Sequence, residues 1–220
     1  MLRYDQYIPA NVREGAPLFV LLHGRGSHKG DLMGLQPHLP PEAMVVTPEA
    51  PFAGAAWGYG PGWAWYRFMG RNRPEPESFE ASQQQLHSFL QELPGQLPVK
   101  PGPIVLGGFS QGGVMSMAYA LRNPGTVRHV VNFSGFLPDH PSVQVTPERV
   151  KGTRIFWGHG TEDAMISFAL AVEGRALLRE AGADLTARDY PMGHWIDGPE
   201  LADVLLWLRH GGGVDPLTGG

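Results

Sequence analysis

Short runs of apolar residues alternate along the chain with segments in which apolar residues recur every three or four positions. Such runs are typical of strands that are covered on both faces of a parallel sheet, and they occupy residues 18–22, 43–46, 104–106, 127–133 and 154–157. The periodic segments predict amphipathic helices, and they occupy residues 77–93, 111–122, 167–181 and 200–210. Strands separated by helices indicate the α/β class, with a mostly parallel central sheet and helices on both of its faces.

Other segments carry weaker patterns. Residues 3–8 and 184–190 alternate in polarity, which predicts two outer strands, and residues 32–39 predict a short helix. Residues 52–76 hold many aromatic side chains among glycines and prolines without either period, which predicts a long aromatic loop. We expect a single domain over residues 1–210, followed by a flexible glycine-rich tail over residues 211–220.

A serine stands where one predicted strand ends and a helix begins. The sequence Gly108-Phe109-Ser110-Gln111-Gly112 follows the apolar run 104–106 and opens the periodic segment 111–122. In that context the pattern G-x-S-x-G predicts a strained turn that exposes a nucleophilic serine. The alternative is a glycine-rich turn that holds a serine by chance. We favour the nucleophile, with Ser134 as the next candidate.

A serine nucleophile needs a base, and the base needs an acidic partner. Among nine histidines, His194 follows the last predicted strand and precedes the last predicted helix, which is the place that the order serine, acid, histidine requires. His159 is its competitor, but it precedes Glu162 and Asp163 and is expected to shape its loop. The acid is expected after residue 160, where Glu162 and Asp163 are adjacent and physical reasoning excludes neither. Asp139 is a further alternative.

Negative charge on a tetrahedral intermediate needs preorganised donors. One is expected to be the backbone N–H of Gln111, which begins a helix, and the other the backbone N–H of Arg25, in the loop after residues 18–22. The Arg25 side chain is expected to be solvated, with a contact to a substrate carboxylate as the alternative. Trp57, Trp63 and Trp65, in the aromatic loop, are predicted to line the substrate pocket or else to form a small core beneath the loop.

Composition excludes several other kinds of protein. The net charge is −4 and the pI about 6.1, so no basic patch indicates a nucleic-acid partner. No segment has the ~20 apolar residues of a membrane span. The chain has no cysteine, which excludes disulfides, a thiol nucleophile and zinc–thiolate sites and makes a cytoplasmic location the default expectation. No His, Asp or Glu spacing indicates a metal site.

Four motifs together resemble the phospholipase/carboxylesterase branch of the α/β-hydrolases, which includes small bacterial carboxylesterases and acyl-protein thioesterases. They are residues 22–26 (Leu-His-Gly-Arg-Gly), 108–113 (Gly-Phe-Ser-Gln-Gly-Gly), 159–163 (His-Gly-Thr-Glu-Asp) and 193–194 (Gly-His). The resemblance implies an α/β-hydrolase fold without a large cap domain, no cofactor, and hydrolysis of carboxylic esters or thioesters. It also implies Asp163 as the acid. Ala164 and Ser167 stand where many members have proline, and residues 65–68 match the family's aromatic motif only loosely, so the acyl pocket is not carried over.

We therefore expect a serine hydrolase with the triad Ser110, Asp163 and His194, acting on esters of short to medium acyl chains. An acyl-protein thioesterase or lysophospholipase is the alternative, and a ligand-binding protein without activity is a more distant one. The expected partner is a small-molecule ester or thioester, with a homodimer as a further possibility.

Overall fold

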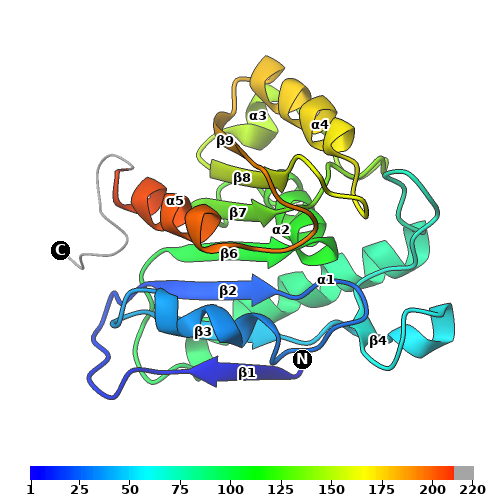
Figure 1. Cartoon of the computed structure of the whole chain (residues 1–220). Helices are drawn as coiled ribbons and strands as arrows, with labels where there is room; N and C mark the ends of the chain where they lie inside the picture. The colour runs from blue at the N-terminus through cyan, green and yellow to red at the C-terminus, as the bar shows by residue number, and fades with distance from the viewer. Residues whose placement is uncertain (211–220) are drawn as a thin grey trace.

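The computed structural model describes residues 1–210, and its centre is a sheet of seven strands (Figure 1). In spatial order these are β1 (Tyr4–Tyr7), β3 (Met44–Pro48), β2 (Leu18–Leu22), β6 (Ile104–Phe109), β7 (His129–Phe133), β8 (Arg154–Gly160) and β9 (Asp184–Tyr190). β1 pairs antiparallel with β3, and the other neighbours pair parallel. The predicted mostly parallel sheet with two outer strands is therefore confirmed.

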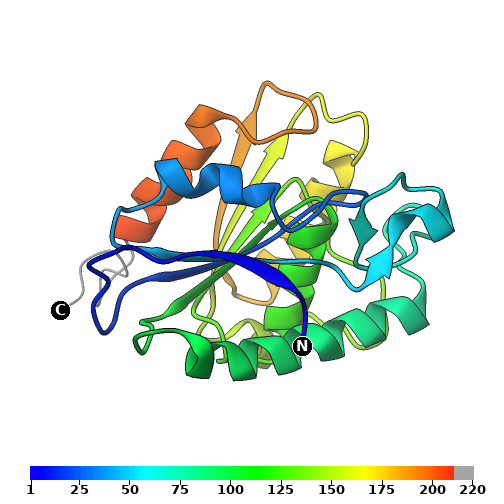
Figure 2. The ribbon, with the colours of Figure 1, turned by 90° about the horizontal axis from the view of Figure 1, so that it is seen from below.

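Helices cover both faces of the sheet. The α-helices are α1 (Pro76–Glu92), α2 (Gln111–Arg122), α3 (Pro147–Val150), α4 (Phe168–Glu180) and α5 (Gly198–Arg209), and the 3₁₀ segments are η1 (Leu32–His38), η2 (Gly54–Trp57) and η3 (Leu93–Gln96). One core lies beneath α1, α2 and α4, and a second lies beneath η1 and α5. Figure 2 shows these two layers on opposite sides of the sheet. The predicted helix at residues 32–39 is a 3₁₀ segment that contains Pro37, which removes one backbone donor.

The apolar pattern of each strand matches its burial. All five residues of β2 are buried, and β2 lies between β3 and β6 near the middle of the sheet. In β9, by contrast, only Tyr190 is buried, because this strand forms the edge. A continuous apolar run therefore marks a strand between two helix layers, and an alternating one marks an edge.

The aromatic loop is more ordered than its sequence predicts. Within residues 52–76 the strands β4 (Phe52–Ala53) and β5 (Trp63–Ala64) pair antiparallel around η2. The prediction of a loop without regular structure was wrong here, because two-residue strands are too short to show a period of two. This small hairpin lies beside the carboxyl ends of the parallel strands, toward which β2 and β6 point in Figure 1.

None of the helices within residues 1–210 combines the length and the apolar character needed to cross a bilayer. The predicted glycine-rich tail, residues 211–220, lies outside the described residues.

Candidate active site

Ser110 lies in the sharp turn between β6 and α2. Its φ of 54° and ψ of −116° are strained for a residue with a side chain. The turn is held by its amide, which donates a hydrogen bond of 2.8 Å to the carbonyl oxygen of Phe133 on β7. A Cβ at Gly112 would overlap the carbonyl oxygen of Leu22, so only glycine lets α2 start this close to β2. The sequence therefore forms the strained strand-to-helix turn that its glycines predict.

His194 and Asp163 form a hydrogen-bonded pair on two neighbouring loops. The Nδ1 atom of His194 lies 2.6 Å from Oδ2 of Asp163, and a carboxylate can only accept, so the ring donates from Nδ1. The other carboxylate oxygen, Oδ1, accepts the backbone N–H groups of Met165 and Ile166 at 2.8 Å each. This arrangement leaves Nε2 of His194 as the basic nitrogen of the ring.

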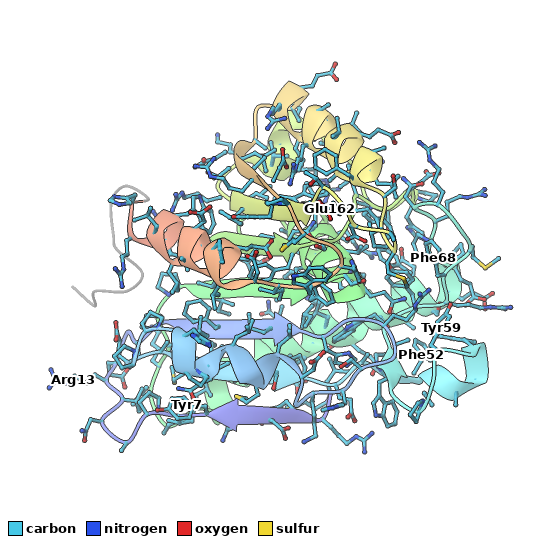
Figure 3. All side chains as sticks on the ribbon, viewed as in Figure 1. Tyr7, Arg13, Phe52, Tyr59, Phe68 and Glu162 are labelled. Atoms are coloured by element: carbon cyan, nitrogen blue, oxygen red, sulfur yellow. The ribbon has the colours of Figure 1, made fainter. Side chains whose placement is uncertain are left out.

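The alternative acids are placed differently. Glu162 and Asp139 are both exposed, whereas Asp163 is buried, and Figure 3 labels Glu162 beside the carboxyl end of β8. Burial on this loop therefore distinguishes two adjacent carboxylates that the sequence could not.

His159 is buried behind the pair. Its Nε2 atom lies 2.9 Å from the carbonyl oxygen of Ile166 and 3.5 Å from Oδ2 of Asp163. Burial is the main cause that lowers the pKa of His159, so the ring is neutral and donates from Nε2 to the Ile166 carbonyl. His159 thus shapes the loop that carries Asp163, as the sequence predicts.

Ser110 and His194 line one pocket at the carboxyl ends of the strands, with a volume of about 170 Å³. The Phe109 ring packs against the His194 ring with centroids 4.6 Å apart, which fixes the imidazole. The other candidate nucleophile, Ser134, is fully buried and is not among the residues that line the pocket.

Two backbone amides of the pocket are free to donate. Gln111 is the first residue of α2, so its N–H has no acceptor within the helix. Arg25 follows β2 in a loop, and within residues 1–210 its N–H has no backbone acceptor. Both residues line the pocket beside Ser110.

The loop that carries Arg25 is held by His23. The Nδ1 atom of His23 donates to the Gly24 carbonyl at 2.7 Å, and Nε2 accepts the amide of Ala50 at 3.0 Å. Burial lowers the pKa of His23 to about 4, so the ring stays neutral and can make both bonds at once. The indole of Trp65 donates to the His23 carbonyl at 2.9 Å, which adds a third restraint.

Trp57, Trp63 and Trp65 were predicted to line the substrate pocket, but they are not among the residues that line the pocket at Ser110. Trp65 is fully buried in the core, Trp63 packs beneath the guanidinium of Arg3 at 4.6 Å, and Trp57 packs on Phe52 with centroids 5.0 Å apart. The alternative, a separate small core beneath the loop, is not formed either, because Trp65 belongs to the main core beneath α1, α2 and α4 and Trp63 packs against that core.

Other apolar side chains line the pocket in their place. They are Tyr66, Phe68, Phe109, Phe136, Met165 and Ile166. Phe136 follows the carboxyl end of β7 and Met165 follows Asp163, and this position after a parallel strand was a signal that sequence reasoning could have used. Tyr66 and Phe68 come from a segment with no period, so no pattern indicates which way they face.

The side chain of Gln111 has a role that the sequence analysis missed. Its Oε1 atom accepts the backbone N–H of Trp65 at 3.0 Å, and its Nε2 donates to the carbonyl of Tyr66 at 2.8 Å. One buried amide therefore ties the aromatic segment to the start of α2.

Within residues 1–210, no cluster of three or more His, Asp or Glu side chains is arranged to hold a metal ion.

Known proteins with similar sequences include carboxylesterases and acyl-protein thioesterases. The chain is 34% identical over 111 residues to Carboxylesterase SOBER1 of Arabidopsis thaliana, a match that covers 50% of this chain and 49% of the relative. The chain thus spans about half the length of the curated carboxylesterases it matches first. It is 26% identical to Acyl-protein thioesterase 1 of Candida albicans, over 92% of this chain and 95% of that one.

Solved structures share the fold over nearly the whole chain. The crystal structure of esterase PE8 is 27% identical and superposes with a TM-score of 0.78, covering 94% of this chain and 98% of the other. A family model described as Phospholipase/Carboxylesterase matches residues 5–210. The resemblance predicted from the four motifs is therefore confirmed, and this chain belongs to the phospholipase/carboxylesterase family.

Proposed function

We propose that this protein is a serine carboxylesterase that cleaves esters through a covalent acyl-enzyme, with Ser110, His194 and Asp163 as its triad. The observation that carries the proposal is the Asp163–His194 hydrogen bond of 2.6 Å at the edge of a pocket that also holds the strained Ser110. Within residues 1–210 the Ser110 hydroxyl makes no hydrogen bond to His194, and such contacts often tighten only when substrate binds.

The geometry supports the following reaction. Nε2 of His194 takes the proton of the Ser110 hydroxyl while Oγ attacks the ester carbonyl carbon. The amides of Arg25 and Gln111 donate to the oxyanion, and Asp163 stabilises the imidazolium. The carbon–oxygen bond to the alcohol then breaks, and His194 gives its proton to the departing oxygen. Water repeats the sequence on the acyl-enzyme, which releases the carboxylic acid and restores Ser110.

Short to medium acyl chains fit the pocket best. Its volume of about 170 Å³ is below the ~300–1,000 Å³ of pockets that enclose drug-sized ligands. No separate cap domain stands over it in the described part of the chain. Long acyl chains would extend past the rim into water and gain little from burial.

An acyl-protein thioesterase is the second candidate. It is favoured by the Candida albicans thioesterase, whose match covers nearly all of both chains. Thioesters and oxygen esters share the same acyl-enzyme, so the triad alone does not distinguish them.

The test is a series of p-nitrophenyl esters from C2 to C16, run beside matched thioesters on the native protein and on Ser110→Ala. We expect the highest kcat/KM between C2 and C8, and loss of at least ~10³-fold in the variant. An optimum at C16, or a preference for thioesters, would favour the second candidate. Undiminished turnover by Ser110→Ala would contradict the proposal.

A cytoplasmic location and a homodimer also stay predictions. Cell fractionation and sedimentation analysis would test them.

A further inference from the structure

One cation that lines the pocket has no ion-pair partner among residues 1–210. Arg25 is the one Lys or Arg side chain that lines the pocket within residues 1–210, and it forms no ion pair with them. Among the described residues that line the pocket, Asp31 has the one carboxylate, and its Oδ2 accepts the Ser27 hydroxyl at 2.6 Å. The charge of Arg25 is therefore available to a ligand.

The guanidinium of Arg25 is held by two aromatic rings. Its central carbon lies 4.8 Å from the centroid of Tyr59 and 5.9 Å from that of Phe68. The two rings are fixed to each other, because the Tyr59 hydroxyl accepts the backbone N–H of Phe68 at 2.8 Å. Figure 3 shows both side chains on the side of the molecule toward which β2 and β6 run. A stacked guanidinium keeps its N–H groups free along its edge, so Arg25 loses little conformational freedom on binding an anion.

A second donor lies in the same pocket. Tyr66 lines it and is fully buried, yet its hydroxyl has no hydrogen-bond partner among the described residues. Its backbone is held by the carbonyl, which accepts Nε2 of Gln111 at 2.8 Å, and its ring packs edge-on against Phe79 with centroids 5.6 Å apart. Burial raises the pKa of the Tyr66 hydroxyl, while the nearby charge of Arg25 acts in the opposite direction, so the group is a neutral donor. A buried hydroxyl without a partner is costly, and an oxygen of a substrate would satisfy it.

We infer that the Arg25 guanidinium and the Tyr66 hydroxyl form an anion-binding subsite beside Ser110, separate from the two backbone amides that bind the oxyanion. This subsite selects esters that carry a second, anionic group such as a carboxylate. This inference rests on the proposed esterase function and names its substrate class. The carboxylate of Asp31 also lines the pocket, and its negative charge disfavours an anion close to it. A planar guanidinium and a fixed hydroxyl together match the two oxygens of a carboxylate better than an apolar acyl tail does.

The test compares stable ester pairs that differ in charge and little in shape. On the acyl side the pair is monomethyl glutarate and methyl 5-methylhexanoate, followed by titration of released acid. On the alcohol side it is 4-acetoxybenzoate and methyl 4-acetoxybenzoate, followed by ultraviolet absorbance. We expect kcat/KM to favour the anionic member by about tenfold or more in one pair, which then locates the subsite on the acyl or the alcohol side.

Three variants connect that preference with the proposed residues. Arg25→Gln should lower the anionic-to-neutral ratio of kcat/KM by about tenfold, Arg25→Lys should lower it less, and Tyr66→Phe should lower it severalfold. The matched control is Arg67→Gln, since Arg67 is exposed, pairs with Glu75 at 3.6 Å and is not among the pocket-lining residues. Its ratio should equal that of the native protein.

The anionic-to-neutral ratio of kcat/KM tests the subsite, whereas cleavage of the esters tests the esterase function on which the subsite rests. If both pairs show no anionic preference, or if Arg25→Gln keeps the native ratio, the subsite is contradicted even though neutral esters are cleaved. If neither member of either pair is cleaved, or if cleavage survives Ser110→Ala, the esterase proposal itself fails.

Discussion

Nδ1 of His194 lies 2.6 Å from Oδ2 of Asp163, although the two residues are 31 positions apart and come from different loops. The loops meet because β8 and β9 are parallel neighbours, so their carboxyl ends lie at the same edge of the sheet. Asp163 is buried and Glu162 is exposed, so one of two adjacent carboxylates is placed to fix the imidazole.

Asp163→Asn should therefore lower kcat by about 10⁴-fold, because the amide would favour the wrong tautomer of His194. Glu162→Gln is the matched control and should stay within about twofold of the native rate. Steady-state kinetics on a short-chain p-nitrophenyl ester measure both. The reverse ranking would transfer the acid role to Glu162, and small effects in both would direct attention to Asp139.

The side chain of Gln111 should contribute to stability independently of its backbone amide. Gln111→Leu keeps the amide but leaves the N–H of Trp65 and the carbonyl of Tyr66 without partners in a buried position. We expect a loss of about 2 kcal/mol in the free energy of unfolding, measured by urea denaturation, together with a lower kcat/KM. Gln84→Leu, on the exposed face of α1, should change neither quantity. Equal stability of the two variants would mean that the aromatic segment is held in another way.

Gly112 should not tolerate any side chain. Gly112→Ala places a methyl group against the carbonyl oxygen of Leu22, which would force α2 away from β2. We expect a loss of about 3 kcal/mol or more in unfolding free energy, or failure to fold. Gly34→Ala is the control, because open space surrounds that position in η1. Its stability should stay within about 1 kcal/mol of the native value.

Glu200 should make stability depend on pH. This side chain is fully buried against Gly158, and within residues 1–210 neither of its carboxyl oxygens has a hydrogen-bond partner. Burial is the main cause that raises the pKa of Glu200 to about 8, from an ordinary value of 4.5. Between these two values the folded chain keeps the proton and the unfolded chain loses it, so stability falls as pH rises from 4.5 to 8.

Glu200→Gln removes that titration and keeps the shape of the side chain. The difference in unfolding free energy between this variant and the native protein should therefore shift in favour of the variant as pH rises from 5 to 8, by on the order of 2 kcal/mol. Urea denaturation at several pH values measures it. A difference that does not change with pH would show that Glu200 titrates alike in the folded and unfolded chains.

The sequence predicts the sheet and the turn at Ser110 better than the pocket. The helix expected at residues 111–122 matches α2, Gln111–Arg122. The signals that predict it, its apolar period and the strand before it, lie within one short stretch of sequence. No such local pattern predicts which of Trp65 and Tyr66 reaches the pocket. These neighbours differ in whether they reach the pocket, and their orientation is set by Gln111, which is 45 residues from Tyr66 along the chain.

The choice between the two candidate acids also depends on tertiary structure. Glu162 and Asp163 are both carboxylates after the same strand, and only the amides of Met165 and Ile166, which bond to Oδ1 of Asp163, determine which one is turned inward. Which of the two carboxylates accepts these amides depends on the path of the backbone after β8. The motif resemblance implies Asp163 as the acid without supplying this physical reason.

Labelling with a fluorophosphonate tests whether Ser110 is a nucleophile that His194 activates. The reagent bonds covalently to an activated serine, and peptide mass locates the site. We predict one label per chain on Ser110, none on Ser110→Ala, and labelling of His194→Ala that is slower by at least ~10³-fold. A label on Ser134 or any other residue, or a full rate of labelling without His194, would contradict these roles of Ser110 and His194.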